Sequence, residues 1–392
     1  MNKNYQIILY GATGFTGKLC AEYFRENYPD LNWAIAGRNK NKLEALKSEL
    51  NLDCDIFVAD SDDYEAIKNF VKQTKVVLSA AGPFARYSTK VVEACVECKT
   101  HYTDITGENH WVKGLIDRFH EKAALDGTRI VPSCGYDSIP SDLGVYFSVT
   151  RSNQPVNHVT VYHSAKGGAS GGTTETMFTM GPLPKEMRDP FLLNPKDSVS
   201  ETQKRKSLDN FSVKPIPGTD AFSGMGLMAF ANTRVVRRSS ALFDLNQKSY
   251  GPDFTFKELG SYPSKAAARI TSFVLMSAFL VIATPLRYLV RPLLPKPGDG
   301  PDKEARDNGW FRGLFIAELE DGSEKRFEIY GSGDPGYKST SKMVCEAALT
   351  LAFSDDLPFG NEFGGVLTSA VGLGDPLISR LMKAGITFKA LS

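Results

Sequence analysis

The chain has 392 residues, of which 42% are hydrophobic and 23% are charged, so it is long enough for two domains and too apolar for a disordered chain. Its 46 lysine and arginine residues and 45 acidic residues leave a formal net charge of +1. This balance excludes the broad positive field that gathers DNA or RNA, and we expect no nucleic-acid partner.

The first predicted unit is a strand, a glycine-rich turn and a helix. The N-terminal sequence MNKNYQ leads into a strand without a secretory leader, so we expect a protein on the cytoplasmic side that is not secreted. Three glycines then separate this strand from the helical sequence LCAEYFREN. Such a turn lets a pyrophosphate approach the backbone at a helix N-terminus. The predicted dinucleotide site therefore contains Gly11, Thr13, Gly14, Phe15, Thr16 and Gly17.

The second predicted strand, residues 32–38, has the sequence NWAIAGR and ends in Arg38. Folds that select NAD carry an acidic residue near this point, where it binds the ribose hydroxyls. An arginine would instead pair with the 2′-phosphate of NADP, so we expect NADP(H) rather than NAD(H). The alternative for Arg38 is a solvated charge at the start of the helix RNKNKLEALKSEL.

Further strands alternate with helical segments up to residue 137. The third, CDIFVAD, ends in Asp60, which we expect beside the adenine. The fourth, KVVLSAAGPF, ends in small residues that leave room for the nicotinamide ribose or simply make a tight turn, namely Ala80, Ala81, Gly82 and Pro83. The segments THYTDITG and TRIVPSC continue the pattern. We predict an α/β, Rossmann-like, doubly wound parallel sheet in residues 1–137.

The cysteines and histidines give no pattern typical of a metal site. Cys95 and Cys98 form a CxxC within a predicted helix, and no second CxxC or HxxxH accompanies them. We interpret these thiols as buried side chains and expect no metal cofactor.

Candidate general acids lie where the predicted strands end. They are Tyr102, Asp104, Glu108, Tyr136 and Asp137. Tyr136 and Asp137 come first as catalytic candidates, because their loop lies where the two domains should meet. The competing interpretation, favoured on general grounds, is that Asp137 and Ser138 cap the helix SIPSDLGVYF. Lys166 is either an electrostatic partner of the substrate or an ordinary exposed lysine.

Residues 138–339 are predicted to form a second α+β domain for substrate binding or dimerisation. Its mixed or antiparallel sheet should contain the runs HVTVYHSAKGG, LMAFANTRVVRRS, FRGLFIAELEDG and KRFEIYGSG. Residues 164–175 suit a ligand loop or a helix start near Thr173 or Thr174. Residues 184–217 suit a solvated insertion better than a mobile lid. A helix at residues 340–353 and the segment that follows, within residues 340–392, return to the first domain if the chain resembles a related fold.

The most unusual segment is residues 270–294, which begins with the uncharged sequence ITSFVLMSAFLVIATPL. This run is short for a membrane span and has Pro285 near its end. It could be a buried core helix, a dimer contact or a segment that enters a lipid surface while flanking cations meet headgroups. The arginines and prolines of RYLVRPLLPKPG slightly favour the lipid surface.

Several motifs in order resemble the saccharopine dehydrogenase-like oxidoreductases, in the branch that contains the trans-acting enoyl reductases. They are GATGFTG with AGR, AAGPFARYS, HYTDITGE, PSCGYDSIPSDLG, KGGASGGTTETM, GDPGYKSTSKMVCEAALTLA and GGVLTSAVGLGDPLISRLMKAGITF. The resemblance implies a two-domain NAD(P)-dependent oxidoreductase. Its bacterial enoyl reductases act on double bonds of lipid chains, and its animal members are associated with lipid droplets.

We therefore expect an NADPH-dependent reductase of a hydrophobic, lipid-like enoyl or carbonyl substrate near a membrane or lipid-droplet surface. One alternative is a noncatalytic lipid-surface protein in which the dinucleotide is structural or is sensed. The other is a soluble amino-acid dehydrogenase of the saccharopine type. A homodimer is a further expectation.

Overall fold

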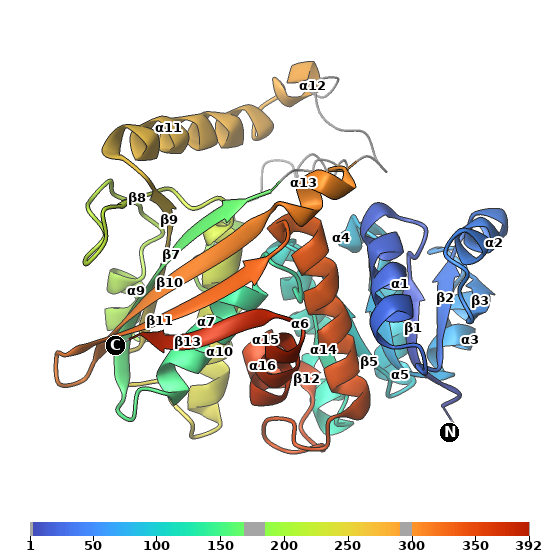
Figure 1. The fold of residues 1–392 in the computed structure, drawn as a ribbon. Helices are drawn as coiled ribbons and strands as arrows, with labels where there is room; N and C mark the ends of the chain where they lie inside the picture. The colour runs from blue at the N-terminus through green and yellow to red at the C-terminus, as the bar shows by residue number, and fades with distance from the viewer. Residues whose placement is uncertain (1–2, 168–184, 291–299, 392) are drawn as a thin grey trace.

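The computed structural model describes residues 3–167, 185–290 and 300–391, which form two sheets with helices packed around them (Figure 1). The expected α/β architecture with a second, mixed sheet is confirmed. Residues 168–175 of the predicted ligand loop, including Thr173 and Thr174, lie outside the described residues.

The first sheet has seven parallel strands in the order β12-β6-β5-β4-β1-β2-β3. Its N-terminal elements are β1 (Tyr5–Tyr10), α1 (Phe15–Asn27), β2 (Trp33–Gly37), α2 (Lys40–Glu49), β3 (Asp55–Val58), α3 (Tyr64–Val71), β4 (Thr74–Ser79), α4 (Phe84–Tyr87), α5 (Thr89–Glu97), β5 (His101–Asp104), α6 (Asn109–Leu125) and β6 (Arg129–Val131). Ile7 and Leu9 of β1 face one core, and Ile8 and Tyr10 face the other. Burial on both faces explains why this strand is apolar from Ile7 to Leu9.

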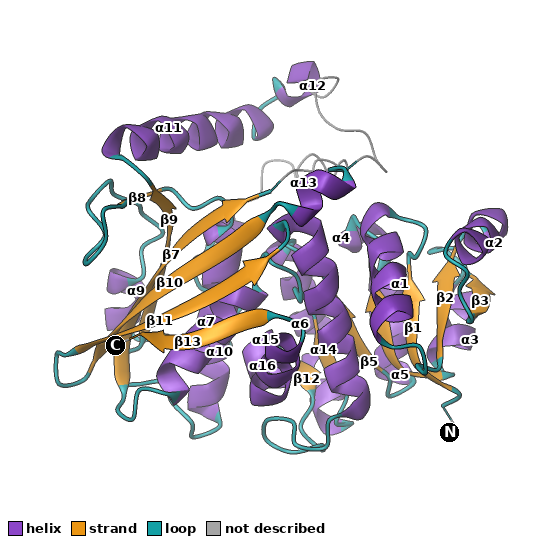
Figure 2. Cartoon of the chain, viewed as in Figure 1, coloured by secondary structure: helices purple, strands orange, loops and turns teal. Residues whose placement is uncertain are grey.

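The second sheet has the order β13-β11-β10-β7-β9-β8, and β7 and β9 are its parallel neighbours (Figure 2). Its strands are β7 (Val156–Lys166), β8 (Phe222–Gly224), β9 (Thr255–Tyr262), β10 (Trp310–Leu319), β11 (Glu324–Ser332) and β13 (Ile386–Leu391). The accompanying helices are α7 (Ile139–Thr150), α9 (Glu201–Lys206), α10 (Ala229–Leu245), α11 (Lys265–Ile282), α12 (Arg287–Val290) and α13 (Lys303–Asp307), with a 3-10 turn at Lys185–Arg188. Helix α7 packs on β10 and β11, and α10 packs on β9.

The C-terminal part of the chain is shared between the two sheets. After a π-helical turn at Pro335–Ser339, helix α14 (Thr340–Phe353) packs against α1, β1, β4 and β5, and β12 (Gly365–Val366) pairs with β6. Two helices, α15 (Ser369–Gly372) and α16 (Gly374–Lys383), then lead to β13, which pairs with β11. Thus α14 and β12 belong to the first domain, and β13 belongs to the second.

The prediction of a strand at residues 227–239 is wrong, because most of this sequence lies in helix α10. Arg234, Arg237 and Arg238 follow one another at helical spacing and are all buried. Adjacent residues of a strand point to opposite faces, whereas residues three and four apart on a helix share one face. The arginine side chains therefore project from one side of α10. Their hydrogen-bond acceptors lie in other segments of the chain, which only folding brings close.

Those partners lie mainly in residues 185–217, the predicted insertion. Arg237 donates to the carbonyl oxygens of Pro190 (3.0 Å) and Ser207 (2.9 Å), and Arg238 donates to that of Leu193. The side chains of Leu192 and Leu193 are buried. The described part of the insertion is therefore attached to α10 rather than solvated along its whole length.

Helix α11 is the main departure from a compact arrangement. Figure 1 shows it as an isolated rod at the outer edge of the second domain, beyond β8 and β9. Of its 18 residues, Ala268 and Ser272 are the buried ones, while Phe273 is 74% exposed and Leu280 is 67% exposed. Within the described part of the chain, it is the helix whose length and composition would suffice to cross a membrane. The core-helix interpretation of this segment is wrong.

Candidate functional site

The glycine turn between β1 and α1 occupies the switch point of the first sheet, where the neighbouring strands β2 and β4 connect in opposite directions. Gly11 has φ +82°, and a Cβ on it would lie 2.7 Å from the backbone nitrogen of Ala81. A Cβ on Gly17 would lie 2.3 Å from the carbonyl oxygen of Gly11. These two glycines are required for the turn to close against its own helix and against the loop after β4.

Gly14 differs from the other two glycines because it is exposed, and a Cβ there would meet only the carbonyl oxygen of Gly11, at 3.4 Å. It precedes α1 without a side-chain cap. The first backbone N–H groups of α1 therefore face open space at the positive end of the helix dipole. This cradle fits a pyrophosphate, with Thr13 and Thr16 beside it, and neither hydroxyl bonds to another described residue.

Phe15 contributes to this turn by its backbone, while its ring packs on the second domain. The ring centroid lies 5.1 Å from that of Tyr337, and Arg306 Cζ lies 5.6 Å from the Phe15 centroid. The turn is thereby fixed against the segment that follows β11.

The loop after β4 contains Ala80, Ala81, Gly82 and Pro83 and is held by a distant carboxylate. Glu108 is buried, and its two carboxylate oxygens accept hydrogen bonds from the backbone N–H groups of Phe84 (2.8 Å) and Ala85 (3.0 Å). Glu108 was expected among the candidate general acids, but both of its oxygens are engaged here. It therefore positions the small-residue loop beside the Gly11 turn.

Asp104 and Tyr102 are likewise structural. The Asp104 carboxylate accepts hydrogen bonds from the N–H groups of Thr106 and Ser133, both at 2.9 Å, and from the Tyr102 hydroxyl at 2.8 Å. Complete burial raises the pKa of Asp104 to about 7, while these donors oppose that shift. The network joins the carboxyl ends of β5 and β6.

Arg38 and Asp60 lie at the carboxyl ends of β2 and β3, as predicted. Both side chains are exposed, and the Arg38 guanidinium forms no ion pair or hydrogen bond with another described residue. Asp60 accepts a hydrogen bond from the backbone N–H of Asp62 at 3.0 Å. Burial raises the pKa of Tyr10 to about 12, and the negative charge of Asp60 adds to this rise while the positive charge of Arg38 opposes it. The three side chains are therefore close enough to interact. Arg38 is available for an anionic ligand.

Tyr136 and Asp137 remain as candidate acids, because neither the Tyr136 hydroxyl nor the Asp137 carboxylate is engaged by another described residue. The Asp137 carboxylate forms no hydrogen bond with another described residue, and its Oδ2 lies 3.7 Å from the position of a Cβ on Gly107, in the loop after β5. Burial raises the pKa of Asp137 to about 6 and also raises that of Tyr136. Neither Asp137 nor Ser138 caps α7 through its side chain, so the capping interpretation is wrong.

A buried polar cluster lies behind Tyr136, and sequence reasoning missed it. Ser141 Oγ lies 2.7 Å from Glu258 Oε2 and 2.9 Å from His163 Nε2, and Asn232 Nδ2 donates to Glu258 Oε1 at 2.9 Å. The rings of His163 and Tyr136 are 6.4 Å apart. Burial raises the pKa of Glu258 to about 7 and lowers that of His163 to about 4. The cluster residues come from α7, β7, α10 and β9, so no local pattern could have indicated them.

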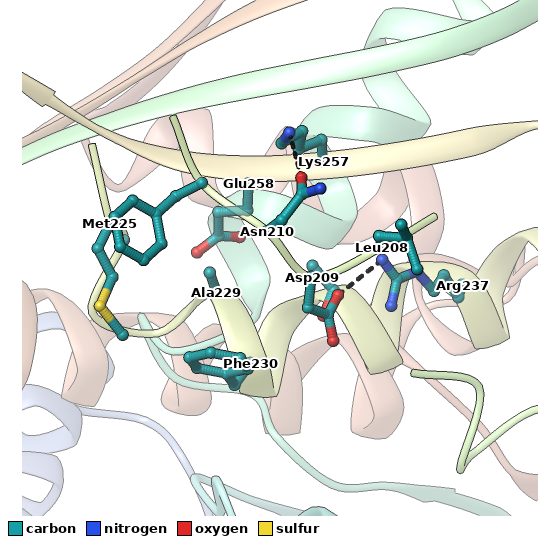
Figure 3. Close-up of a pocket in the computed structure, with 12 residues that line it drawn as sticks. Leu208, Asp209, Asn210, Met225, Ala229, Phe230, Arg237, Lys257 and Glu258 are labelled. Carbon is teal, nitrogen blue, oxygen red and sulfur yellow. Dashed lines mark hydrogen bonds and ion pairs between the residues drawn. The ribbon is translucent and has the colours of Figure 1, made fainter. Parts of the chain in front are cut away.

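Glu258 also lines a small, open pocket between α10 and β9 (Figure 3). Met225, Ala229 and Phe230 form its apolar part, and Asp209 with Arg237 forms an ion pair at 2.8 Å in its polar part. The Phe230 ring lies 6.0 Å from that of Phe279 on α11. The pocket thus lies between the buried carboxylate and the C-terminal end of the exposed helix.

Three other features that the sequence analysis considered are Lys166, the CxxC pair and metal ligands. Lys166 ends β7 as an exposed residue opposite Trp310. Cys95 and Cys98 are buried free thiols. Among the described residues, no group of three or more histidine, cysteine or acidic side chains is arranged to hold a metal ion.

Comparison with known proteins places these features in a family. The model of the saccharopine dehydrogenase NADP binding domain matches residues 7–131. A Mycobacterium tuberculosis protein assigned provisionally as a trans-acting enoyl reductase is 34% identical over 99% of this chain and 97% of its own length. A trans-acting enoyl reductase of Mycobacterium ulcerans is 32% identical over 99% of this chain and 98% of its own length.

A solved structure supports the fold. Apo saccharopine dehydrogenase (L-Glu forming) from Saccharomyces cerevisiae superimposes with a TM-score of 0.56 over 99% of this chain and 100% of that chain, at 14% identity. Taken together with the glycine cradle and the free Arg38, the matches lead to one assignment. The chain belongs to the saccharopine dehydrogenase-like family of NAD(P)-dependent oxidoreductases, in the branch of the trans-acting enoyl reductases.

Proposed function

We propose that the protein is an NADPH-dependent reductase of an activated double bond in a hydrophobic, lipid-like substrate. The observation that carries this proposal is the selective availability of side chains at the carboxyl edge of the first sheet. Asp104 and Glu108 are occupied by backbone donors, whereas Arg38 and Asp137 are left without partners among the described residues. A cation is thus available where the adenosine of the cofactor is expected, and an acid is available where its nicotinamide is expected. The relatives' names add support for the enoyl group.

NADPH supplies the hydride when it is bound, and the chain must hold the substrate and provide a proton. Reduction of an enoyl group adds hydride to one carbon and a proton to its neighbour. The Tyr136 hydroxyl is protonated at neutral pH and forms no hydrogen bond with another described residue, so Tyr136 is our candidate for donating that proton. Asp137, beside Gly107, is suited to orient the donor or return a proton to it.

The pocket beneath α11 supports a hydrophobic substrate. Its apolar wall of Met225, Ala229 and Phe230 begins near α11 and ends at Glu258, whose cluster reaches Tyr136 through His163. An acyl chain that enters along this wall would bring its reactive end toward Tyr136 and Asp137. Burial of its methylene groups would contribute about 0.8 kcal/mol each.

Helix α11 is proposed to lie in the surface of a membrane or lipid droplet on the cytoplasmic side. Strands β9 and β10, which precede and follow this region, both pair with β7 in one sheet. A single crossing by α11 would therefore place two neighbours of the same strand on opposite sides of the bilayer. An interfacial orientation avoids this conflict, and Lys265, Arg269 and Arg287 would meet anionic headgroups.

The cofactor assignment is tested by calorimetric titration of the purified protein with NADPH and NADH. We expect micromolar binding of NADPH and much weaker binding of NADH. Arg38→Ala should weaken NADPH binding by about 1.5 to 3 kcal/mol and leave NADH nearly unchanged, because only NADPH carries the phosphate. Equal weakening of both would refute this role for Arg38, and absence of binding by the wild type would refute the proposed function.

The lipid-surface assignment is tested by flotation with vesicles of phosphatidylcholine and phosphatidylglycerol. The wild type should float with the vesicles, and the double variant Phe273→Glu, Leu280→Glu should remain at the bottom, because two exposed apolar side chains become charged. Leu125→Glu, which changes an 88% exposed leucine on α6, is the matched control and should float. Equal flotation of the double variant would contradict the assignment.

A further inference from the structure

Two arginines approach the same aromatic ring at the carboxyl edge of the first sheet. Arg38 follows β2, and Arg86 lies in α4, directly before Tyr87. Their guanidinium carbons lie 6.0 Å and 5.1 Å from the centroid of the Tyr87 ring. Both arginine side chains are exposed, and the ring is half-buried. Residues from the ends of two strands on opposite sides of β1 thus meet above the end of β1.

Neither guanidinium is neutralised by the protein. Arg38 and Arg86 form no ion pair or hydrogen bond through their side chains with another described residue. The nearby acids have other contacts, since Asp62 lies 3.9 Å from Lys90 Nζ and Asp60 accepts the N–H of Asp62. Two like charges around one ring repel each other, and an anion bound between them would remove that repulsion.

The backbone that carries Arg86 and Tyr87 is fixed before any ligand binds. Glu108 holds the N–H groups at the start of α4, and Ala81 in the same loop touches the Gly11 turn. The ring of Tyr87 can stack with guanidinium groups and limit their rotamers. The loop that carries Arg86 and Tyr87 therefore contacts the same turn that is suited to hold the pyrophosphate.

We propose that Arg86 and Tyr87 complete the 2′-phosphate site of NADPH together with Arg38. This inference rests on the proposed dinucleotide-binding function and extends it to two residues outside the glycine turn and the β2 terminus. The two guanidinium groups bind the phosphate dianion by charge-assisted hydrogen bonds, and Tyr87 holds them in place. NADH has a hydroxyl at this position and leaves both cations unpaired, which gives selectivity against it.

The test uses the full-length protein and calorimetric titration with NADPH, NADH, 2′,5′-ADP and 5′-AMP. The last two probes differ by the 2′-phosphate and lack the nicotinamide. Arg86→Ala should weaken NADPH and 2′,5′-ADP by about tenfold to a hundredfold, while NADH and 5′-AMP change by less than about twofold. Arg38→Ala with Arg86→Ala should lose less than the product of the single effects, because both contact one phosphate.

Further variants separate charge, ring and folding. Arg86→Lys keeps the charge without the planar fork and should recover part of the NADPH affinity. Tyr87→Phe keeps the ring and should bind NADPH within about twofold of the wild type, whereas Tyr87→Leu should weaken NADPH selectively. Arg118→Ala is the matched control, because Arg118 also lies over a ring, that of Phe119 at 4.6 Å, but on α6. Circular dichroism confirms that each variant is folded.

The outcomes distinguish the inference from the function on which it rests. If the wild type prefers NADPH and Arg86→Ala leaves that preference unchanged, the role of Arg86 is overturned while the oxidoreductase assignment remains. The same conclusion follows if Arg86→Ala weakens NADPH and NADH equally. If the wild type binds no dinucleotide, the proposed function itself is overturned.

Discussion

Replacement of Gly14 by alanine is expected to weaken binding of both NADPH and NADH by at least about tenfold without a measurable loss of stability. The backbone of Gly14, at φ −75° and ψ 164°, is one that alanine adopts readily. The added methyl group would meet only the Gly11 carbonyl oxygen, at 3.4 Å. It would, however, project into the open cradle at the start of α1, where the pyrophosphate is expected.

The same substitution at Gly17 should have the opposite consequence. Its Cβ would lie 2.3 Å from the Gly11 carbonyl oxygen and 2.9 Å from Ala12 Cα, which are both backbone atoms. Helix α1 would have to move away from β1, and we expect a loss of about 3 kcal/mol in the free energy of unfolding. The two variants therefore separate the ligand-facing glycine from the packing glycine of one turn.

Thermal unfolding followed by circular dichroism and titration with both dinucleotides are the required measurements. Gly114→Ala on α6 is the control for the substitution itself, because its Cβ would meet no atom within 4 Å. Undiminished dinucleotide binding by Gly14→Ala would show that the turn does not hold the pyrophosphate. A Gly17→Ala protein as stable as the wild type would contradict the geometry of the turn.

Replacement of Glu258 by glutamine should change stability in a manner that depends strongly on pH. Burial raises the pKa of Glu258 to about 7, above the ordinary value near 4.3 that the unfolded chain has. The folded state therefore binds more protons between these two values, and the wild type loses stability as pH rises through that window. The loss from this group is on the order of 3 kcal/mol by pH 8.

Glutamine carries no charge, so this loss disappears in the variant. We expect the stability of Glu258→Gln relative to the wild type to rise between pH 5 and pH 8 in urea unfolding experiments. Other buried groups, such as Asp137, Asp142 and His163, titrate in both proteins and largely cancel in the difference. Glu44→Gln on α2 controls for the removal of one carboxylate from an exposed site. A difference that is constant with pH would contradict the assignment for Glu258.

Local patterns were sufficient to predict that the proposed cofactor-binding residues lie near one another. Gly11, Gly14 and Gly17 lie within one turn, and Arg38 ends the strand after it, so strand polarity alone brings them to one edge of the sheet. The parallel sheet could be predicted for the same reason, because each of its first five strands is followed by a helix before the next strand begins. Short-range sequence order and spatial order coincide in this region.

The remainder depends on long-range partners that no local pattern indicates. Glu108 was a candidate acid until the structure placed its oxygens on the N–H groups after Pro83. Residues 227–239 resembled a strand because they contain β-branched and aromatic side chains. The carbonyl oxygens that accept hydrogen bonds from the arginines of α10 lie in another segment of the chain, so the local sequence did not reveal them. Glu258 became a candidate only when Ser141 and Asn232 were brought beside it, and those residues are more than 25 positions away.

The C-terminal return of the chain has a consequence for how the protein is made. Strand β12 forms the edge of the first sheet, and α14 covers β1 and β4, yet both come from residues after 339. On the ribosome, the N-terminal domain would emerge with its edge strand unpaired and with the part of its sheet under α14 uncovered. An exposed edge of this kind can pair with other chains. We therefore expect truncation before β12 to release an aggregation-prone product rather than a cofactor-binding domain.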